Sequence, residues 1–374
     1  MQHRRARRKV FSLTCTMDRE GFEKLIVRLP EDKTSFLLGM ESTASYHIPL
    51  FSYLAAHSYR VVIINPLLIH GFSKRSLRKT KTDKKDAFVI AQFLMREQKT
   101  LSAQTPDYLA TELKDLARRR EKLADHVTSL KADMKRILSV TFPELEYITG
   151  VFTKATLRLL MEYPSAHAIR RADPSAVANV FKSENQGNRP RTTVKALMDA
   201  TASSVGIVSP AKELALKQEA SLLMHVEEQM KETTKVLMNI LNEKMKQDVE
   251  ILCSMKGIGD NTAMNFLIEM GGTVEIYEND KKLIAASGLD PSTYESGKYA
   301  GKSKISKRGN RHLRRVIWLM ATRVIINNEL FRTYFYKRRK DGLPYKKAVL
   351  ATAHKLIRIM FVMLSRKTYL VMVQ

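Results

Sequence analysis

The sequence has only two cysteines, Cys15 and Cys253, in 374 residues. They lie far apart without metal-ligand spacing, so the sequence excludes a disulfide framework and a zinc motif and is typical of a reducing compartment. It has no uninterrupted apolar run long enough to span a bilayer, and no apolar segment follows its basic start, MQHRRARRKVFSLTC. We therefore expect a cytoplasmic protein without a secretory signal and without a membrane as partner.

Acidic residues are also scarce, with 38 Asp and Glu against 64 Lys and Arg and a formal net charge of +26. Such an excess of cations predicts a polyanionic partner, and nucleic acid is the usual one. A ribosomal-type protein or a merely soluble basic protein has the same balance, so charge alone assigns no activity. A hydrophobic content of 44% is enough for substantial cores.

The first hundred residues alternate between strand and helix patterns. The run TSFLLGME at 34–41 is typical of a buried strand, SYHIPLFSYLAAHS has helical spacing, and YRVVIINP is a second, β-branched strand. Strand, helix and strand with short connections predict a parallel βαβ unit, and a further helix is expected from Asp83.

Two long segments, at about 106–138 and 210–248, carry apolar stripes with charges on their other faces. They predict long amphipathic helices and are coiled-coil candidates. A dimerising or domain-bridging hairpin and an intramolecular bundle both explain them. We expect three domains: an α/β domain at 1–105, a helical linker region at 106–248 and a mainly α-helical domain at 249–374.

The segment ILCSMKGIGDNTAMNFLIEMGG at 251–272 resembles a helix-hairpin-helix. In such a hairpin, glycines let backbone N–H groups approach a phosphate at the start of a helix. Gly257 and Gly259 are therefore candidate nucleic-acid contacts. A tight turn that contacts no ligand is the alternative.

Three carboxylates form a candidate metal site. Glu41 ends the first strand, where binding groups of parallel sheets gather, and Asp83 and Asp86 lie three residues apart on one helical face. Helix capping explains the two aspartates locally, and a solvent-facing strand end explains Glu41. If the three converge, their repulsion requires a cation, and oxygen ligands suit Mg²⁺.

The motifs around these acids resemble those of the DEDD-type insertion-sequence transposases. They are ESTASY at 41–46, NP at 65–66 and KTDKKDA at 81–87, where Ala44 replaces the usual glycine. The far end, from MKGIGDNTAMNFLIEMGG to the basic helices after GNRHLRR, resembles the second domain of the same family, which is also similar to pilin-gene invertases. The resemblance covers nearly the whole chain.

That resemblance implies an RNase H-like, resolvase-like first domain that binds Mg²⁺ or Mn²⁺ through Glu41, Asp83 and Asp86. The family has a further Asp on an opening strand. Asp18 and Asp32 flank a helix instead, so neither takes that role. We expect this domain to lack its first strands, which leaves the activity of the chain open.

The resemblance also implies a serine nucleophile, placed in a Ser-Gly pair. Of Ser292, Ser296, Ser303 and Ser306, only Ser296 precedes a glycine. His312 is a candidate proton relay, although an exposed or packing role explains it as well. The cations around the serine are expected to contact phosphates, and the basic C-terminal helices extend this surface; they are Lys298, Lys302, Lys304, Lys307, Arg308, Arg311, Arg314 and Arg315.

The sequence thus predicts a transposase or site-specific recombinase that cuts and rejoins DNA through Ser296 with metal assistance. By resemblance, its partners are DNA, a structured guide RNA from the element and further copies of the chain in a dimer or tetramer. The alternatives are a metal-dependent nuclease or junction resolvase, and an inactive remnant that binds DNA or RNA.

Overall fold

The computed structural model describes residues 13–33, 36–42, 45–73, 83–97, 101, 103, 107–185, 193–242, 245–292, 295–296, 299–300 and 304–370. Within these ranges, the side chains of residues 67, 83, 84, 181–185, 242, 295, 296, 299 and 300 are not described. Contacts group the chain into two units, Met1–Tyr108 and Leu109–Gln374. The division into three domains stays a prediction.

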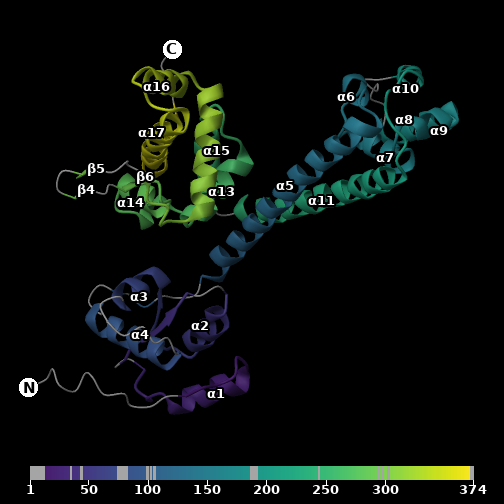
Figure 1. Cartoon of the computed structure of the whole chain (residues 1–374). Coiled ribbons are helices and arrows are strands. Elements are labelled where there is room, and N and C mark those ends of the chain that lie inside the picture. Colours follow the sequence, from purple (N-terminus) through teal and green to yellow (C-terminus); the bar gives the residue numbers. More distant parts are fainter. Residues whose placement is uncertain are drawn as a thin grey trace, which may run out of the picture. The chain divides into compact units, whose positions relative to one another are not determined.

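The N-terminal unit is built around a parallel pair of strands (Figure 1). Its elements are α1 (Arg19–Arg28), β1 (Leu38–Glu41), α2 (His47–Ala56), β2 (Val61–Ile64), α3 (Pro66–Ser73) and α4 (Asp83–Glu97). The register runs from Leu38 opposite Val61 to Glu41 opposite Ile64. The predicted βαβ unit and the helix from Asp83 are confirmed, whereas the complete RNase H-like fold is not visible in this two-stranded sheet.

Side chains alternate between the two faces of this sheet, as the strand period requires. Leu38 and Met40 pack with Leu54 of α2. On the other face, Val62 and Ile64 pack with residues of α3 and α4. The sheet is therefore covered by helices on both faces, which fits its apolar composition.

Asp18 caps the helix that was expected before the first strand. It is the N-cap of α1, and its Oδ1 accepts a hydrogen bond from the backbone N–H of Gly21 at 2.8 Å. This hydrogen bond lowers the pKa of Asp18, as expected for a capping carboxylate.

The C-terminal unit contains two long helices, α5 (Tyr108–Thr141) and α11 (Pro210–Asn242), which lie side by side in Figure 1. Lys131 pairs with Glu227 at 2.7 Å and Arg120 donates to Thr234 at 2.8 Å. The order of these contacts makes the helices antiparallel, so they pack within one chain. Whether they also form a coiled coil with a second copy stays a prediction.

Among the described residues, five short helices lie between the long ones along the chain and pack with them around one apolar cluster. They are α6 (Leu145–Ile148), α7 (Lys154–Glu162), α8 (Ala166–Arg171), α9 (Pro174–Asn185) and α10 (Val194–Ala202).

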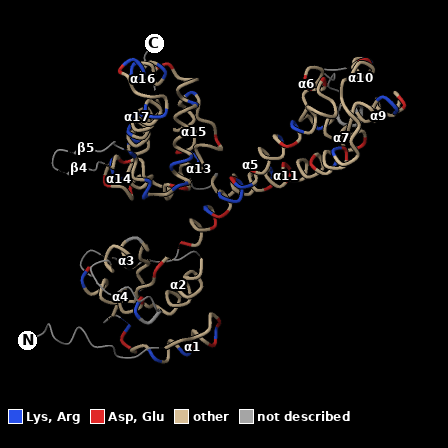
Figure 2. The backbone as a smooth tube through the Cα atoms, viewed as in Figure 1, with Lys and Arg blue, Asp and Glu red and all other residues tan. Residues whose placement is uncertain are grey.

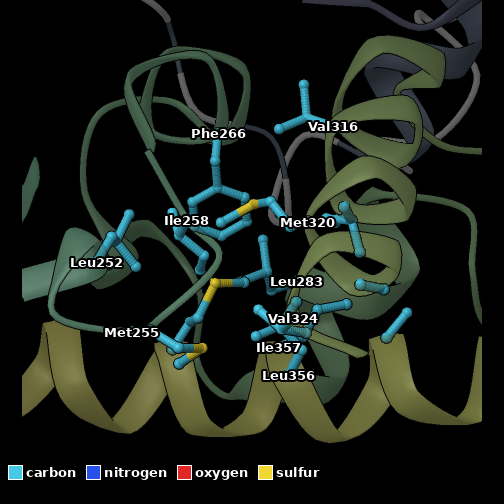
Figure 3. Close-up of a cluster of buried hydrophobic side chains, with 14 of the residues drawn as sticks. Leu252, Met255, Ile258, Phe266, Leu283, Val316, Met320, Val324, Leu356 and Ile357 are labelled. Atoms are coloured by element: carbon cyan, nitrogen blue, oxygen red, sulfur yellow. The ribbon is translucent and has the colours of Figure 1, made fainter. Parts of the chain in front are cut away.

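In the rest of this unit, the described residues form helices and short two-residue strands. Its elements are α12 (Lys246–Cys253), α13 (Asp260–Met270), the 3₁₀ helix η2 (Val274–Ile276), α14 (Asp280–Ala286), β3 (Pro291–Ser292), β4 (Glu295–Ser296), β5 (Tyr299–Ala300), β6 (Lys304–Ile305), α15 (Arg311–Asn327), α16 (Glu329–Lys340) and α17 (Tyr345–Arg366). Figure 3 shows its core, where Phe266, Met320 and Ile357 from α13, α15 and α17 converge.

Helix α17 has the length and average composition of a segment that could span a bilayer, although Lys355 and Arg358 interrupt its apolar run. Among the described residues, it is the one helix long and apolar enough to do so, yet half of that stretch is buried inside the unit. Its apolar side supplies Leu356, Met360 and Leu364 to the core. A helix in a protein core, covered by its neighbours, can be as long and as apolar as a membrane span.

Candidate functional site

Glu41 lies on the face of the sheet that α4 covers. Leu38 and Met40 face α2, so Gly39 and Glu41 face the other way. A Cβ built on Gly39 would come within 2.4 Å of Leu94 and 3.2 Å of Ile90, both in α4. A side chain at this position would have to displace the end of Leu94, because the helix packs closely against the strand.

Asp83 and Asp86 begin the same helix that packs on Gly39. Ile90 follows Asp86 by four residues and Asp83 by seven, so all three positions share one helical face. The packing of α4 on β1 therefore places Glu41 and Asp86 on the same side of the sheet. The side chain of Asp83 lies outside the described residues.

The donor chemistry of these acids suits a divalent cation. A strand-end glutamate and acids in the first turn of a covering helix offer carboxylate oxygens from two elements. Among the side chains that the structure describes, no group of three or more His, Cys, Asp or Glu is close enough to hold a metal. Because Asp83 is not among those side chains, the three-carboxylate site stays a prediction.

Ser296 lies on an antiparallel arm between α14 and α15. Strands β3 and β6 pair first, and β4 and β5 pair farther along, with Ser296 opposite Tyr299. Gly297 and Lys298 lie between these partners and outside the described residues. Figure 1 shows the β4–β5 pair away from the helices of this unit. The sequence did not predict this arm, because two-residue strands leave no periodic pattern.

The base of the arm is held by polar and backbone contacts. Ser306 donates its hydroxyl to Asp290 Oδ1 at 2.5 Å, and the Ser306 N–H donates to the Asp290 carbonyl at 2.9 Å. A Cβ on Gly309 would lie 2.2 Å from the Ala286 carbonyl oxygen and 2.3 Å from the Gly288 nitrogen. The end of α14 and the start of α15 therefore fix where the arm leaves the core.

The basic residues predicted to bind nucleic acid have different surroundings. Exposed positions are occupied by Lys304, Lys307, Arg308 and Arg311. Arg314 is half-buried and donates to the Ser287 carbonyl at 2.9 Å. Lys298 and Lys302 lie outside the described residues.

The Gly-Ile-Gly turn connects α12 to α13, as a helix-hairpin-helix requires. Gly257 has φ +104°, and a Cβ there would lie 2.9 Å from the Arg323 carbonyl oxygen, so packing on α15 accounts for this glycine. Gly259 is the N-cap of α13 and faces open space. Burial and a hydrogen bond to Asp260 raise the pKa of Cys253 to about 12, which keeps this thiol protonated.

A buried carboxylate that sequence reasoning missed connects three helices. Glu269 of α13 has a side chain 3% exposed and binds Arg118 of α5 through two contacts, at 2.9 and 3.1 Å. Asn310, the N-cap of α15, donates to the same carboxylate at 2.6 Å. Burial alone would raise the pKa of Glu269, but the hydrogen bonds from Arg118 and Asn310 outweigh it and lower the pKa. A lone acid inside the apolar run FLIEM was the available signal.

A second charged cluster connects α5 to α15. His312 Nδ1 lies 2.5 Å from Glu121, and Arg315 contacts Glu121 at 2.8 Å and Asp125 at 2.5 Å. His312 is thus half-buried and held by a carboxylate of its own chain, and its role as a proton relay stays a prediction. Arg315 likewise binds carboxylates of its own chain.

Two transposase family models match separate parts of the chain. A DEDD transposase model of the IS110 type matches residues 3–143, and a model described as a transposase of the IS116/IS110/IS902 family matches residues 249–336. The first match contains the candidate acids and the second contains Ser296. The chain carries the two transposase domains of the IS110/IS116 family. A transposase acts on DNA, so DNA is a partner of this chain, and the DEDD family implies a divalent metal.

Relatives of this transposase include proteins of insertion elements. A 42 kDa protein of insertion element IS900 from Mycobacterium paratuberculosis is 27% identical over 84% of this chain and 79% of its own length. A 44.8 kDa protein of IS116 from Streptomyces clavuligerus is 26% identical over 85% of this chain and 79% of its own length. A pilin gene-inverting protein from Moraxella bovis is 35% identical over 24% of this chain and 28% of its own length.

Proposed function

We propose that this transposase cuts and rejoins DNA through Ser296. In the cutting step, Ser296 Oγ forms a bond to a phosphorus atom of the DNA and loses its proton. The phosphorus–oxygen bond to a deoxyribose then breaks, and the departing oxygen takes up a proton. Attack by a hydroxyl of another DNA end reverses these changes, joins the strands and frees the serine.

One observation carries this proposal: the two transposase domains occur in order, with acids in the first and the Ser296-Gly297 pair in the second. The exposed lysines and arginines beside the arm support it, because a phosphodiester needs cationic partners close to the nucleophile.

Glu41, Asp83 and Asp86 would hold a Mg²⁺ or Mn²⁺ ion, with the fourth acid of the DEDD set unassigned. When bound, such an ion supplies stabilisation of charge on the attacked phosphate. The proposal includes a structured guide RNA and assembly into dimers or tetramers. If an RNA pairs with the DNA, base pairing carries the specificity and the protein reads shape and backbone.

Strand exchange by Ser296→Ala and Ser292→Ala chains tests the proposal. Ser292 lies exposed on β3 of the same arm and provides the matched control. Ser296→Ala should lose strand exchange by on the order of a thousandfold or more while DNA binding stays intact, and Ser292→Ala should retain both.

The other outcomes identify the alternatives. If Ser296→Ala still cuts DNA in a metal-dependent reaction, the protein is a nuclease or junction resolvase. If the unaltered chain binds DNA or RNA but never cuts, it is an inactive remnant.

A further inference from the structure

Two exposed tyrosines, one near the end of α16 and one at the start of α17, are held in place by packing. Tyr336 is 59% exposed and Tyr345 is 55% exposed. Both rings meet Phe335 edge-on, with centroid distances of 5.4 and 5.6 Å, and Phe335 itself is buried. The two rings are thus positioned by packing while much of their surface stays in water.

Lysines and arginines surround these tyrosines. Four of them occupy the last turn of α16, namely Lys337, Arg338, Arg339 and Lys340. Cations there suit the negative end of the helix dipole, so helix stability explains them. Figure 2 shows the concentration of Lys and Arg at α16.

The lysines of α17 have no such explanation. Lys346 and Lys347 follow Tyr345 in the first turn, which contains no acid, and the N-cap Pro344 makes no side-chain capping hydrogen bond. Cations at a helix N-terminus oppose the dipole and destabilise the helix. A bound anion would remove this cost.

Most of these charges are not neutralised within the protein. Arg338 pairs with Asp341 at 3.3 Å, and Arg339 donates to the Leu343 carbonyl at 2.7 Å. In the part of the chain that the structure describes, no ion pair involves Lys337, Lys340, Lys346 or Lys347.

We propose that these two tyrosines and four lysines form a platform that binds single-stranded nucleic acid. Unpaired bases stack on Tyr336 and Tyr345, and the lysines contact the phosphates on either side. Stacking on aromatic side chains beside a cationic track is the general mode of single-strand binding. A duplex keeps its bases stacked on one another and can use only the lysines.

The composition of the turn favours nucleic acid over an anionic lipid surface. Between Tyr336 and Lys347 the only aliphatic side chain is Leu343, which packs against the core. A membrane-binding surface needs apolar side chains that enter the bilayer. Except for Tyr336, the platform lies beyond residues 249–336 that the second family model matches, and it is a binding surface additional to the Ser296 arm.

Fluorescence anisotropy with the full chain tests the platform. The probes are a labelled oligothymidylate of about 20 nucleotides and a duplex of equal length, in EDTA so that no metal-dependent cleavage occurs. A chain with Tyr336→Leu and Tyr345→Leu should bind the single strand about ten- to a hundredfold more weakly, with an unchanged salt dependence. Its duplex affinity should stay within about twofold of the unaltered chain.

Two further variants provide the controls. Tyr147→Leu removes a tyrosine of α6 that is 85% exposed, and it should leave both affinities unchanged. Lys346→Gln with Lys347→Gln should reduce the slope of log affinity against log salt by about 0.7 for each lysine. Melting temperatures of all variants should match that of the unaltered chain, because the changed side chains are exposed.

Three outcomes would overturn the platform. The tyrosine variant could bind the single strand as tightly as the unaltered chain, or it could lose single strand and duplex equally. The unaltered chain could also sediment with phosphatidylserine vesicles while ignoring the oligonucleotide. The platform rests on the proposed function only because both require nucleic acid as a partner. Ser296→Ala should bind the probe normally, so failure of the serine chemistry and failure of the platform give different results.

Discussion

The candidate acids and the candidate serine are held in position by different kinds of contact. Glu41 and Asp86 belong to a strand and a helix that pack through apolar side chains, with Leu94 of α4 against Gly39 of β1. Ser296 lies on a short arm whose base depends on polar contacts, such as the Ser306–Asp290 hydrogen bond, and on close backbone packing at Gly309.

The acids are therefore positioned by regular secondary structure, whereas the serine is positioned by a few local contacts. The apolar packing of α4 on β1 keeps Glu41 and Asp86 on one side of the sheet without help from the acids, so substitution of an acid should change chemistry and leave the fold intact. The base of the arm depends on a few polar and backbone contacts, so changes there should alter both stability and the position of Ser296.

Among the variants that compare the two regions, the largest effect is expected at the acids. Asp86→Asn should reduce metal-dependent strand exchange by on the order of a hundredfold or more, because a neutral amide binds a divalent ion poorly. Glu97→Gln, at the other end of α4, is the control and should retain activity. Titration of Mg²⁺ and Mn²⁺ against strand exchange measures the effect, and an unchanged metal dependence in Asp86→Asn would remove this residue from the site.

The next largest effect is expected from loss of the buried ion pair between Arg118 and Glu269. Arg118→Met should lower the free energy of unfolding by about 3 kcal/mol, because Glu269 would stay buried with only Asn310 as partner. Arg315→Met, which breaks contacts to Glu121 and Asp125 at a more exposed position, should cost about 1 kcal/mol or less. Urea unfolding followed by the fluorescence of Trp318, the one tryptophan, measures both.

The loss of stability caused by Arg118→Met should become smaller as the pH falls. The pKa of Glu269 in the folded protein lies below its ordinary value of 4.5, so its pairing contributes stability above that pH and loses it as the pH falls through the folded pKa. The stability gap between the unaltered chain and Arg118→Met should therefore be largest near neutral pH and narrow below pH 4.5. A gap independent of pH would contradict an ionised Glu269.

Two glycine substitutions compare the units directly. Gly309→Ala should destabilise by about 3 kcal/mol, because its Cβ would meet backbone atoms that cannot move independently. Gly39→Ala meets the end of the Leu94 side chain, which can shift, and should cost about 1 kcal/mol. Trp318 fluorescence should report the change at Gly309 and not that at Gly39, whereas circular dichroism reports both. A larger effect at Gly39 would reverse the comparison.

The smallest expected effect is at Ser306. Ser306→Ala removes the hydroxyl that donates to Asp290 and should cost about 1 kcal/mol. Strand exchange should fall further than this stability loss explains, because the base of the arm is loosened. If activity stays unchanged while stability falls, the hydrogen bond has no part in positioning Ser296.

Local patterns predicted the regular elements of both units. The βαβ unit, the helix from Asp83 and both long helices follow from apolar periodicity and capping signals, which are properties of neighbouring residues. For the same reason, the spacing of Asp83 and Asp86 was sufficient to place them on one helical face.

Contacts between distant residues could not be predicted in this way. Arg118 and Glu269 are 151 residues apart, and no local pattern joins them. The arm escaped prediction because its strands are two residues long, and the role of Gly257 depends on Arg323 in another helix. Such contacts arise only when helices pack, so the surroundings of Ser296 required the structure although its motif did not.

The central claim is that Ser296 forms a bond to DNA, and trapping of that bond tests it most directly. The full chain would be incubated with a DNA substrate and metal, quenched with denaturant, digested with protease and nuclease, and analysed by mass spectrometry. The account predicts a nucleotide attached to the peptide that contains Ser296, and its absence from Ser296→Ala. Strand exchange without any adduct, or an adduct on another residue, would contradict it.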